Sequence, residues 1–171
     1  MQISKVLITG IAGSGGSYLA EYIAKNHPEI EIHGLAYSRS TRLNLEPLGK
    51  KITRHEADLM DFGSVFSVLD KLKPDAIFHL AAFANVLASF YTPNTFLSNN
   101  ILGTCNLFEA VRAAHLDPII QLCSTSEVYG QVDSMDVPIK ETAPLKPASP
   151  YAVSKVAQDL LGWSYFTSYQ M

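Results

Sequence analysis

The chain has 171 residues, of which 47% are hydrophobic and 17% charged, and its formal net charge is −3; this size and composition fit one globular domain with a sizeable core. Without a basic excess or a lysine–arginine cluster, the sequence argues against a nucleic-acid partner. No apolar run is long enough to cross a bilayer, and a strand-like pattern begins within the first residues, which leaves no room for a signal peptide, so we expect a cytoplasmic protein without a membrane partner.

Apolar, strand-like runs alternate with helix-period segments along the whole chain. The expected strands are 5–10, 29–37, 50–58, 74–82 and 118–126, and the expected helices are 16–26, 61–72, 93–115 and 149–169. Near-continuous apolar strands joined by helices are typical of a parallel sheet covered on both faces. Because crossovers are right-handed, we expect an α/β fold with a doubly wound, Rossmann-like parallel sheet. The polar, Pro-rich stretch 131–149 is expected to be a long surface loop, and such loops are often functional.

A glycine-rich turn, TGIAGSGG, follows the first strand and opens the first helix. Bound phosphate needs bare backbone N–H groups at a helix N-terminus, where side chains would block its approach. Glycine-rich turns also occur for steric reasons alone, but a strand before and a helix after favour a dinucleotide site. The predicted cofactor contacts in this turn are Gly10, Gly13, Ser14, Gly15 and Gly16.

The end of the second strand bears on the choice of dinucleotide. NAD enzymes usually place an acidic residue there for the ribose 2′-hydroxyl. This chain instead has AYSRSTR, which offers Ser38, Arg39 and Arg42. Hydroxyls and a guanidinium suit a 2′-phosphate, since arginine can hold it with paired hydrogen bonds. We therefore predict NADP, bound in part by Ser38 and Arg39, with NAD as the alternative and a solvated loop as the simpler interpretation.

Two further strand ends carry candidate cofactor contacts. ADL after the third strand supplies Asp58, whose carboxylate can accept from the adenine amino group, and Leu59. HLAA after the fourth strand supplies Leu80, Ala81 and Ala82, of which the alanines are small enough to let the backbone lie against a cofactor. Each motif is weak alone, because Asp58 could cap a loop and LAA could be ordinary core. Their order along the chain is what favours a cofactor site.

The start of the last expected helix, SPYAVSK, places Tyr151 and Lys155 four residues apart on one helical face. A lysine ammonium one turn away stabilises a tyrosine phenolate, which makes the tyrosine usable as a proton acceptor. Such pairs also arise by chance in helices. Because this pair follows the glycine motif and the fifth strand, we predict that it is catalytic.

The fifth strand ends in QLCSTSEVYG, where Thr125, Ser126 and Glu127 interrupt an apolar run. In doubly wound folds, ligands bind beside the carboxyl ends of the strands. Capping of the strand end is the simpler interpretation of these polar residues. The two cysteines, Cys105 and Cys123, lack metal-ligand spacing, and we expect both to be buried free thiols.

Taken together, these motifs resemble the extended short-chain dehydrogenase/reductase family of nucleotide-sugar epimerases and dehydratases, and within it the GDP-mannose 4,6-dehydratases. The resemblance runs from Lys5 to the end of the chain and includes TGIAGSGGSYLAEYI, EIHGL, ADLMD, IFHLAAFANVLASF, NILGTCNLFEA, STSEVYG and SPYAVSK. Two departures are FANV, where the dehydratases usually have Gln-Ser-His-Val, and AYSRS, where they tend to carry paired arginines. The resemblance implies that residues 1–171 are an N-terminal NADP-binding domain and that a C-terminal substrate domain is absent from this chain.

The resemblance also implies roles for the catalytic candidates. Thr125 would hydrogen-bond the sugar 4-hydroxyl while Tyr151, assisted by Lys155, takes its proton and C4 gives hydride to the cofactor. Glu127 would remove the C5 proton and help expel the C6 hydroxyl as water, before hydride returns to C6. This implies a 4,6-dehydratase acting on GDP-mannose. The alternatives are a 4-epimerase, a 4-keto reductase, a UDP-glucuronate decarboxylase or a non-catalytic NADP-binding protein.

The last two long helices are more apolar than one sheet face requires, and the resemblance implies a homodimer or homotetramer. We expect the contacts to come from Leu102, Leu107, Phe108, Leu160, Leu161 and Trp163. The simpler interpretation is that these side chains only cover the sheet.

Overall fold

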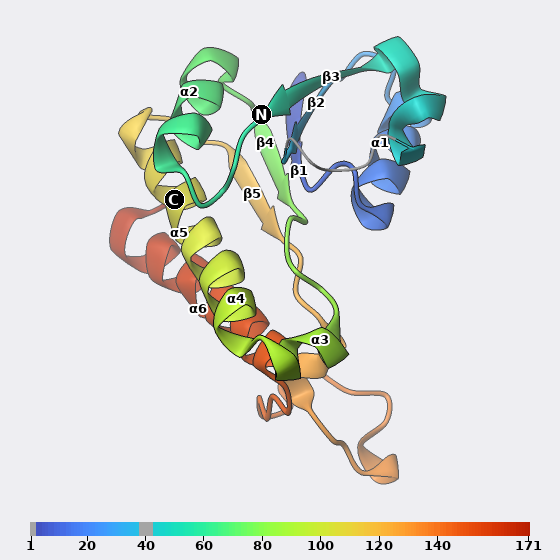
Figure 1. The fold of residues 1–171 in the computed structure, drawn as a ribbon, viewed down its shortest axis with the longest axis vertical. Helices are drawn as coiled ribbons and strands as arrows, with labels where there is room; N and C mark the ends of the chain where they lie inside the picture. Colours follow the sequence, from blue (N-terminus) through green and yellow to red (C-terminus); the bar gives the residue numbers. More distant parts are fainter. Residues whose placement is uncertain (1–2, 38–42) are drawn as a thin grey trace.

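Five parallel strands form one sheet in the order β3-β2-β1-β4-β5, shown in Figure 1. The computed structural model describes residues 3–37 and 43–171, so the predicted contacts Ser38 and Arg39, and Arg42 beside them, lie outside the described residues. The strands are β1 (Lys5–Thr9), β2 (Glu31–Ala36), β3 (Ile52–Glu56), β4 (Ala76–His79) and β5 (Ile119–Leu122). The predicted doubly wound α/β fold is confirmed.

Helices connect the strands and cover both faces of the sheet. The α-helices are α1 (Ser14–Asn26), α2 (Phe62–Leu72), α3 (Val86–Tyr91), α4 (Pro93–Leu97), α5 (Gly103–Ala113) and α6 (Pro150–Tyr169). The 3-10 segments are η1 (Leu43–Lys51), η3 (Ser126–Tyr129) and η4 (Ser134–Asp136), and η2 (Ser98–Leu102) is a π-helical turn between α4 and α5. The long helix predicted over 93–115 therefore contains a π-helical turn, and α3 and η1 were not predicted.

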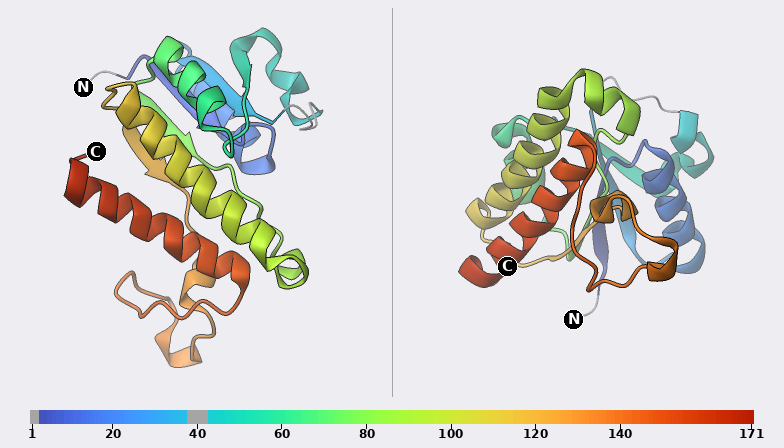
Figure 2. Two further views of the ribbon diagram at one scale, coloured as in Figure 1. Left: turned by 60° about the vertical axis from the view of Figure 1, so that its left-hand side comes forward. Right: turned by 90° about the horizontal axis from the view of Figure 1, so that it is seen from below.

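Alternate residues of β1 point to opposite faces and serve two separate cores. Val6 and Ile8 pack with α1 and η1 on one face of the sheet. Leu7 packs with α2 and α5 on the other face. The two helical layers are visible on either side of the sheet in Figure 2. The two cores therefore hold β1 from both faces of the sheet.

Helix α6 packs against α4, η2 and α5, beside which it runs in Figure 2. The Tyr165 hydroxyl on α6 donates to the Glu109 carboxylate on α5 at 2.6 Å, and the rings of Phe108 and Tyr165 lie 4.8 Å apart. Leu107 and Phe108 are almost fully buried within the chain, so their prediction as oligomer contacts is wrong: they cover the sheet. Leu102, Leu160 and Trp163 remain exposed.

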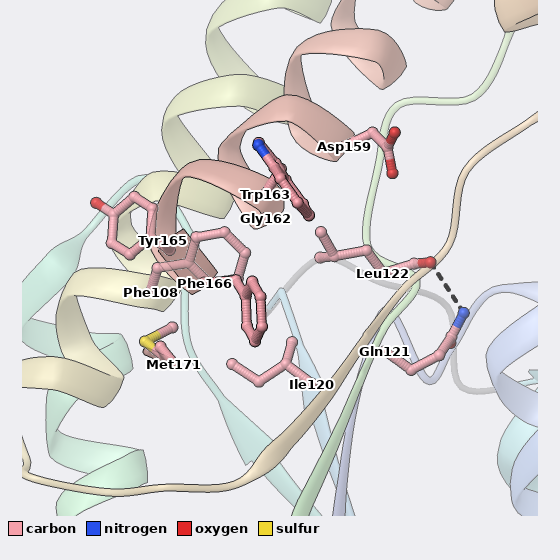
Figure 3. Close-up of a pocket in the computed structure, with 10 residues that line it drawn as sticks. All are labelled: Phe108, Ile120, Gln121, Leu122, Asp159, Gly162, Trp163, Tyr165, Phe166 and Met171. Atoms are coloured by element: carbon pink, nitrogen blue, oxygen red, sulfur yellow. Dashed lines mark hydrogen bonds between the residues drawn. The ribbon is translucent and has the colours of Figure 1, made fainter. Parts of the chain in front are cut away.

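Strand β5 is the edge of the sheet, and it is shorter and more exposed than predicted. It ends at Leu122, after which Thr125 caps the short segment η3. Ile119 is 54% exposed because no helix covers its face of the sheet at this edge among the described residues. On the other face, α6 touches β5 at Gly162 and Leu122, and a hollow of 530 Å³ is lined by residues of both elements. Figure 3 shows Ile120 and Leu122 of β5 on one side of it and Trp163 and Phe166 of α6 on the other.

The predicted surface loop 131–149 leaves η3 and returns to the start of α6. Near its end, the Lys146 N–H donates to the carbonyl of Val128 in η3 at 2.9 Å, which ties the loop back to η3. Among the residues that the structure describes, none of the helices combines the length and hydrophobicity needed to span a membrane. The same part of the chain contains no cluster of side chains suited to hold a metal ion.

Candidate active site

The glycine-rich turn between β1 and α1 lies directly against the end of β4. Gly10 adopts φ +69°, and a Cβ atom there would lie 2.8 Å from the backbone of Ala81. A Cβ atom on Gly16 would lie 2.5 Å from the Gly10 carbonyl oxygen. The Gly13 N–H donates to that same oxygen at 2.9 Å and closes the turn. Larger residues at positions 10 and 16 would therefore push the turn away from the sheet.

The exposed side of this turn fits the pyrophosphate of a dinucleotide. Gly13, Ser14 and Gly15 are exposed, and Gly13 caps the 13-residue helix α1 without a side-chain hydrogen bond. The first N–H groups of the helix therefore face outward with the positive end of its dipole. A Cβ atom on Gly13 would meet only the Gly10 carbonyl oxygen, so the cradle is bare backbone, as an anion site requires.

The ends of β1, β4 and β5 meet at one edge of the sheet. Thr9 pairs with His79, and His79 pairs with Leu122, so the segments that follow these three strands leave the sheet side by side. Leu80, Ala81 and Ala82 are half-buried at this edge. The Ala81 N–H donates to the Thr9 hydroxyl at 3.1 Å. This contact fixes the segment after β4 against the strand that carries the glycine turn.

The predicted adenine contacts after β3 have local partners in the structure. The Asp58 carboxylate accepts from the Met60 N–H at 2.9 Å, as a loop cap does. The Leu59 side chain is buried in the core with α2 and α5, and its carbonyl accepts from the Asn106 side chain at 2.8 Å. Asp58 and Leu59 stay predicted cofactor contacts, and this segment is already well anchored without a ligand.

Tyr151 and Lys155 lie in the first two turns of α6, on the face that points into the protein. The Ser149 hydroxyl caps the helix by accepting from the Ala152 N–H at 3.0 Å. Lys155 is only 4% exposed, and this burial lowers the pKa of its ammonium group. The Lys155 charge contributes to the lowered pKa of His79 in β4, and the neighbouring Cys123 after β5 partly offsets the lowering of the Lys155 pKa, so the ammonium group lies near the ends of these two strands.

The strand-end residues Thr125 and Glu127 lie in and beside η3, which packs against α6. The Thr125 hydroxyl accepts from the Glu127 N–H at 3.3 Å, so part of its role is the predicted cap. Ser126 and Glu127 are exposed, and the Glu127 carboxylate makes no hydrogen bond or ion pair within residues 3–37 and 43–171. Cys123 is also exposed, which contradicts the expectation of two buried thiols; Cys105 is half-buried.

Sequence reasoning missed a set of buried polar side chains that lies behind the candidate catalytic residues. Each is at most 5% exposed, and hydrogen bonds or close polar contacts join them across β1, β4, η2, α5 and α6. We call this set the His79 network, and it comprises Thr9, His79, Asn100, Thr104, Ser154 and Gln158. Two features of the sequence could have pointed to this network: a histidine inside the apolar run IFHLAA and two polar residues in SKVAQ. Both features also fit an ordinary core.

Nearly the whole sequence also matches a known family. The family model described as GDP-mannose 4,6 dehydratase matches residues 7–171. The chain belongs to this family. A GDP-mannose 4,6-dehydratase from Vibrio cholerae is 35% identical over 98% of this chain and 47% of its own length. The resemblance to nucleotide-sugar epimerases and dehydratases is therefore confirmed.

Solved structures extend the likeness to the fold. The UDP-Glc/GlcNAc 4-epimerase from Campylobacter jejuni superposes with a TM-score of 0.87 and 31% identity, covering 96% of this chain and 50% of its own. DesIV, a dTDP-glucose 4,6-dehydratase from Streptomyces venezuelae solved with NAD and TYD bound, superposes with a TM-score of 0.85 and 31% identity. The match covers 98% of this chain and 53% of the DesIV chain. The chain spans about half the length of the relatives it matches.

The burial of His79 predicts that the folded chain loses stability in mild acid. Burial, reinforced by the charge of Lys155, lowers the pKa of His79 from 6.5 to about 3. Between these values the unfolded chain binds a proton that the folded chain does not, so the free energy of unfolding falls as pH falls. We expect a loss of roughly 1.4 kcal/mol per pH unit below pH 6.5 from this group.

Urea unfolding at pH 7.0, 6.5, 6.0 and 5.5 measures this slope above the range where carboxylates titrate. Burial also lowers the pKa of His55, which adds stability loss of the same sign, so His55→Gln serves as the matched control and should keep most of the slope. His79→Gln should remove most of it. An unchanged slope in His79→Gln would contradict the prediction.

Proposed function

We propose that this chain provides the dinucleotide site and the proton-transfer residues of an NADP-dependent nucleotide-sugar 4,6-dehydratase that converts GDP-mannose to GDP-4-keto-6-deoxymannose. The observation that carries the proposal is the combination of a buried Tyr151–Lys155 pair with an exposed, unpaired carboxylate, Glu127, on the neighbouring segment η3. Membership of the GDP-mannose 4,6-dehydratase family supports it. A 4-epimerase needs a tyrosine and a hydroxyl but has no use for a second base.

The residues that would hold the cofactor follow the ends of four strands. Gly10, Gly13, Ser14, Gly15 and Gly16 would bind the pyrophosphate through the backbone and the start of α1. Ser38 and Arg39 would select the 2′-phosphate, and Asp58 and Leu59 would border the adenine. Leu80, Ala81 and Ala82 would line the path to the nicotinamide. When bound, the nicotinamide ring supplies the temporary acceptor for the C4 hydride.

Oxidation at C4 requires that a proton leave the sugar hydroxyl as hydride leaves the carbon. Tyr151 would take this proton as phenolate, and the adjacent Lys155 ammonium would stabilise the phenolate before the transfer. Thr125 would donate or accept a hydrogen bond at the same hydroxyl and so orient it. Both side chains are buried, so little water would screen the attraction between the phenolate and the ammonium group.

Elimination follows once C4 is a ketone, because the carbonyl acidifies the C5–H bond. Glu127 would remove the C5 proton, and the electron pair released would form the C5–C6 double bond as the C6–O bond breaks. The same carboxyl group would return its proton to the departing hydroxyl, so that water leaves. Hydride then returns to C6, and C5 receives a proton equivalent to the one that Tyr151 took from the C4 hydroxyl, which gives the 4-keto-6-deoxy sugar and water with no net redox change.

The role of Glu127 is tested by Glu127→Gln, which is nearly isosteric and removes only the base. Because the chain spans about half the length of its relatives, activity is measured on the longest natural form of the protein that contains these residues. We expect elimination to slow by about 10²–10⁴-fold, the usual contribution of a positioned general base. Reduced cofactor should then accumulate in a single turnover and be visible by its absorbance.

Tyr151→Phe is the matched control, because it should prevent cofactor reduction altogether. A Glu127→Gln enzyme that forms the 4-keto-6-deoxy product at the wild-type rate would refute the base assignment. Product analysis also separates the alternatives: an epimerised sugar, a reduced 4-keto sugar or released carbon dioxide would each identify a different enzyme, and no turnover at all would favour a non-catalytic binding protein.

The cofactor preference is tested by calorimetric titration of the 171-residue chain with NADP and with NAD. We expect tighter binding of NADP, because the segment after β2 offers hydroxyls and guanidinium groups and no carboxylate. Arg39→Ala should cost about 1–3 kcal/mol for NADP and little for NAD, as expected for a lost charge-assisted hydrogen bond. Lys25→Ala, which removes an exposed positive charge from α1, is the control. A preference for NAD would refute the assignment.

We also propose that the protein self-associates through the exposed apolar side chains of η2 and α6. Leu102, Leu160 and Trp163 are 51%, 55% and 66% exposed, and such contacts are typical of obligate dimers. Leu160→Glu should halve the mass measured by light scattering at micromolar concentration. Tyr18→Glu, at an exposed site on α1 across the sheet, should leave the mass unchanged. A monomeric wild-type protein would refute self-association.

A further inference from the structure

The His79 network lies between the two parts of the proposed active site. Thr9 precedes the glycine turn, and Ser154 lies between Tyr151 and Lys155 in α6. His79 is at the centre, only 2% exposed, and none of the proposed chemical steps uses it. Buried polar groups are costly unless they are fully hydrogen-bonded, so a set of this size in the core of the sheet needs an explanation.

One tautomer of His79 satisfies the hydroxyl hydrogen bonds of the network, and in it Gln158 Nε2, 3.5 Å from His79 Nε2, makes a close polar contact and not a hydrogen bond. The Thr104 hydroxyl donates to the Asn100 carbonyl oxygen at 2.7 Å. Its one proton is then used, so at 2.9 Å it must accept from His79 Nε2. His79 therefore carries its proton on Nε2, and its bare Nδ1 must accept from the Thr9 hydroxyl at 2.8 Å. The Thr9 oxygen in turn accepts from the Ala81 N–H.

The other end of the network reaches the candidate catalytic helix. The Asn100 side-chain amide group donates to the Ser154 hydroxyl at 2.9 Å, and that hydroxyl donates to the Tyr151 carbonyl oxygen at 2.6 Å. Asn100 also accepts from the Phe83 N–H at 2.8 Å. It belongs to the π-helical turn η2, and such turns often occur at functional sites. A continuous polar path thus joins Ala81, beside the predicted cofactor, to Tyr151.

We propose that His79 is a positioning residue of the proposed reaction, which holds the segment after β4 and the Tyr151–Lys155 helix in a fixed relation through two hydrogen bonds of opposite direction. The proposal rests on the proposed cofactor function. Nδ1 acts on the cofactor side, because it orients the Thr9 hydroxyl, which accepts a hydrogen bond from the Ala81 N–H. Nε2 acts on the catalytic side, because it holds Thr104, which Gln158 of α6 also contacts.

This arrangement differs in a measurable way from that of a histidine that only fills the core. Asparagine places a carbonyl oxygen near the position of Nδ1, so His79→Asn can keep the acceptor for Thr9 and lose the donor to Thr104. Glutamine places its amide group near the position of Nε2, so His79→Gln does the reverse. A core-filling histidine would give two variants that differ only in stability, whereas a positioning histidine gives two variants with opposite local effects.

The test compares these variants in the 171-residue chain by amide hydrogen exchange and by dinucleotide titration. In His79→Gln, exchange of the Ala81 amide should accelerate at least tenfold, and NADP should bind at least tenfold more weakly. In His79→Asn, the Ala81 amide should stay protected and NADP affinity should stay within threefold of wild type, while amides 154–158 exchange at least tenfold faster. Leu69→Ala, a core truncation on α2 outside the network, controls for lost stability.

Equal changes in the two variants, or the same pattern in Leu69→Ala, would overturn the positioning role. A wild-type chain that binds neither NADP nor NAD would overturn the cofactor function and the positioning role together, which distinguishes it from the first outcome. If either variant fails to fold, ¹⁵N NMR of wild-type His79 decides: a proton on Nε2 supports the proposal, and a proton on Nδ1 overturns it.

Discussion

The close approach of Gly10 to the backbone of Ala81 is the constraint on which the rest of the site depends. A Cβ atom at position 10 would lie 2.8 Å from that backbone, so only glycine lets the end of β1 lie this close to the segment after β4. The helix α1 then begins directly above the sheet edge, with its bare N–H groups facing outward. The same contact brings Thr9 within hydrogen-bonding distance of Ala81 and His79. The absence of a side chain at Gly10 therefore allows the close contact that positions both the glycine turn and the His79 network.

A buried polar network is an unusual way to hold a parallel sheet to its helices, because apolar packing costs less desolvation. Elsewhere in this fold apolar packing is used: Leu7, Leu69 and Leu107 fill one face without a polar contact. Polar contacts replace it where β1 and β4 meet the start of α6. Apolar side chains can slide past one another at little cost, whereas a directed hydrogen bond tolerates only small displacements. Directed polar contacts are thus concentrated where the ends of β1 and β4 lie beside α5 and α6.

Most of the fold and part of the candidate site could be predicted from the sequence, and the failures have a common physical cause. The glycine turn and the Tyr151–Lys155 pair are local patterns whose spacing alone determines which groups share a face. The exposure of Ile119 and the burial of Phe108 depend on which elements cover a strand edge or a helix face, and this is not encoded in local spacing. The partners of His79 come from β1, α5 and α6, so they are separated by many residues in sequence. Residues 38–42, on which the predicted preference for NADP over NAD depends, lie outside the described residues.

The geometry of η3 shows why the capping and catalytic interpretations of the fifth strand end are compatible. The Thr125 hydroxyl accepts from the Glu127 N–H, which uses one lone pair and leaves its proton and its other lone pair available for a ligand. The cap also starts the turn that places Glu127 one residue beyond Ser126, on the exposed side of η3. A cap needs the hydroxyl and the backbone, but it does not need a carboxylate at position 127. The cap accounts for the position of Thr125 in structural terms, while the exposed Glu127 carboxylate takes no part in it, which is why the proposal of a general base rests on Glu127.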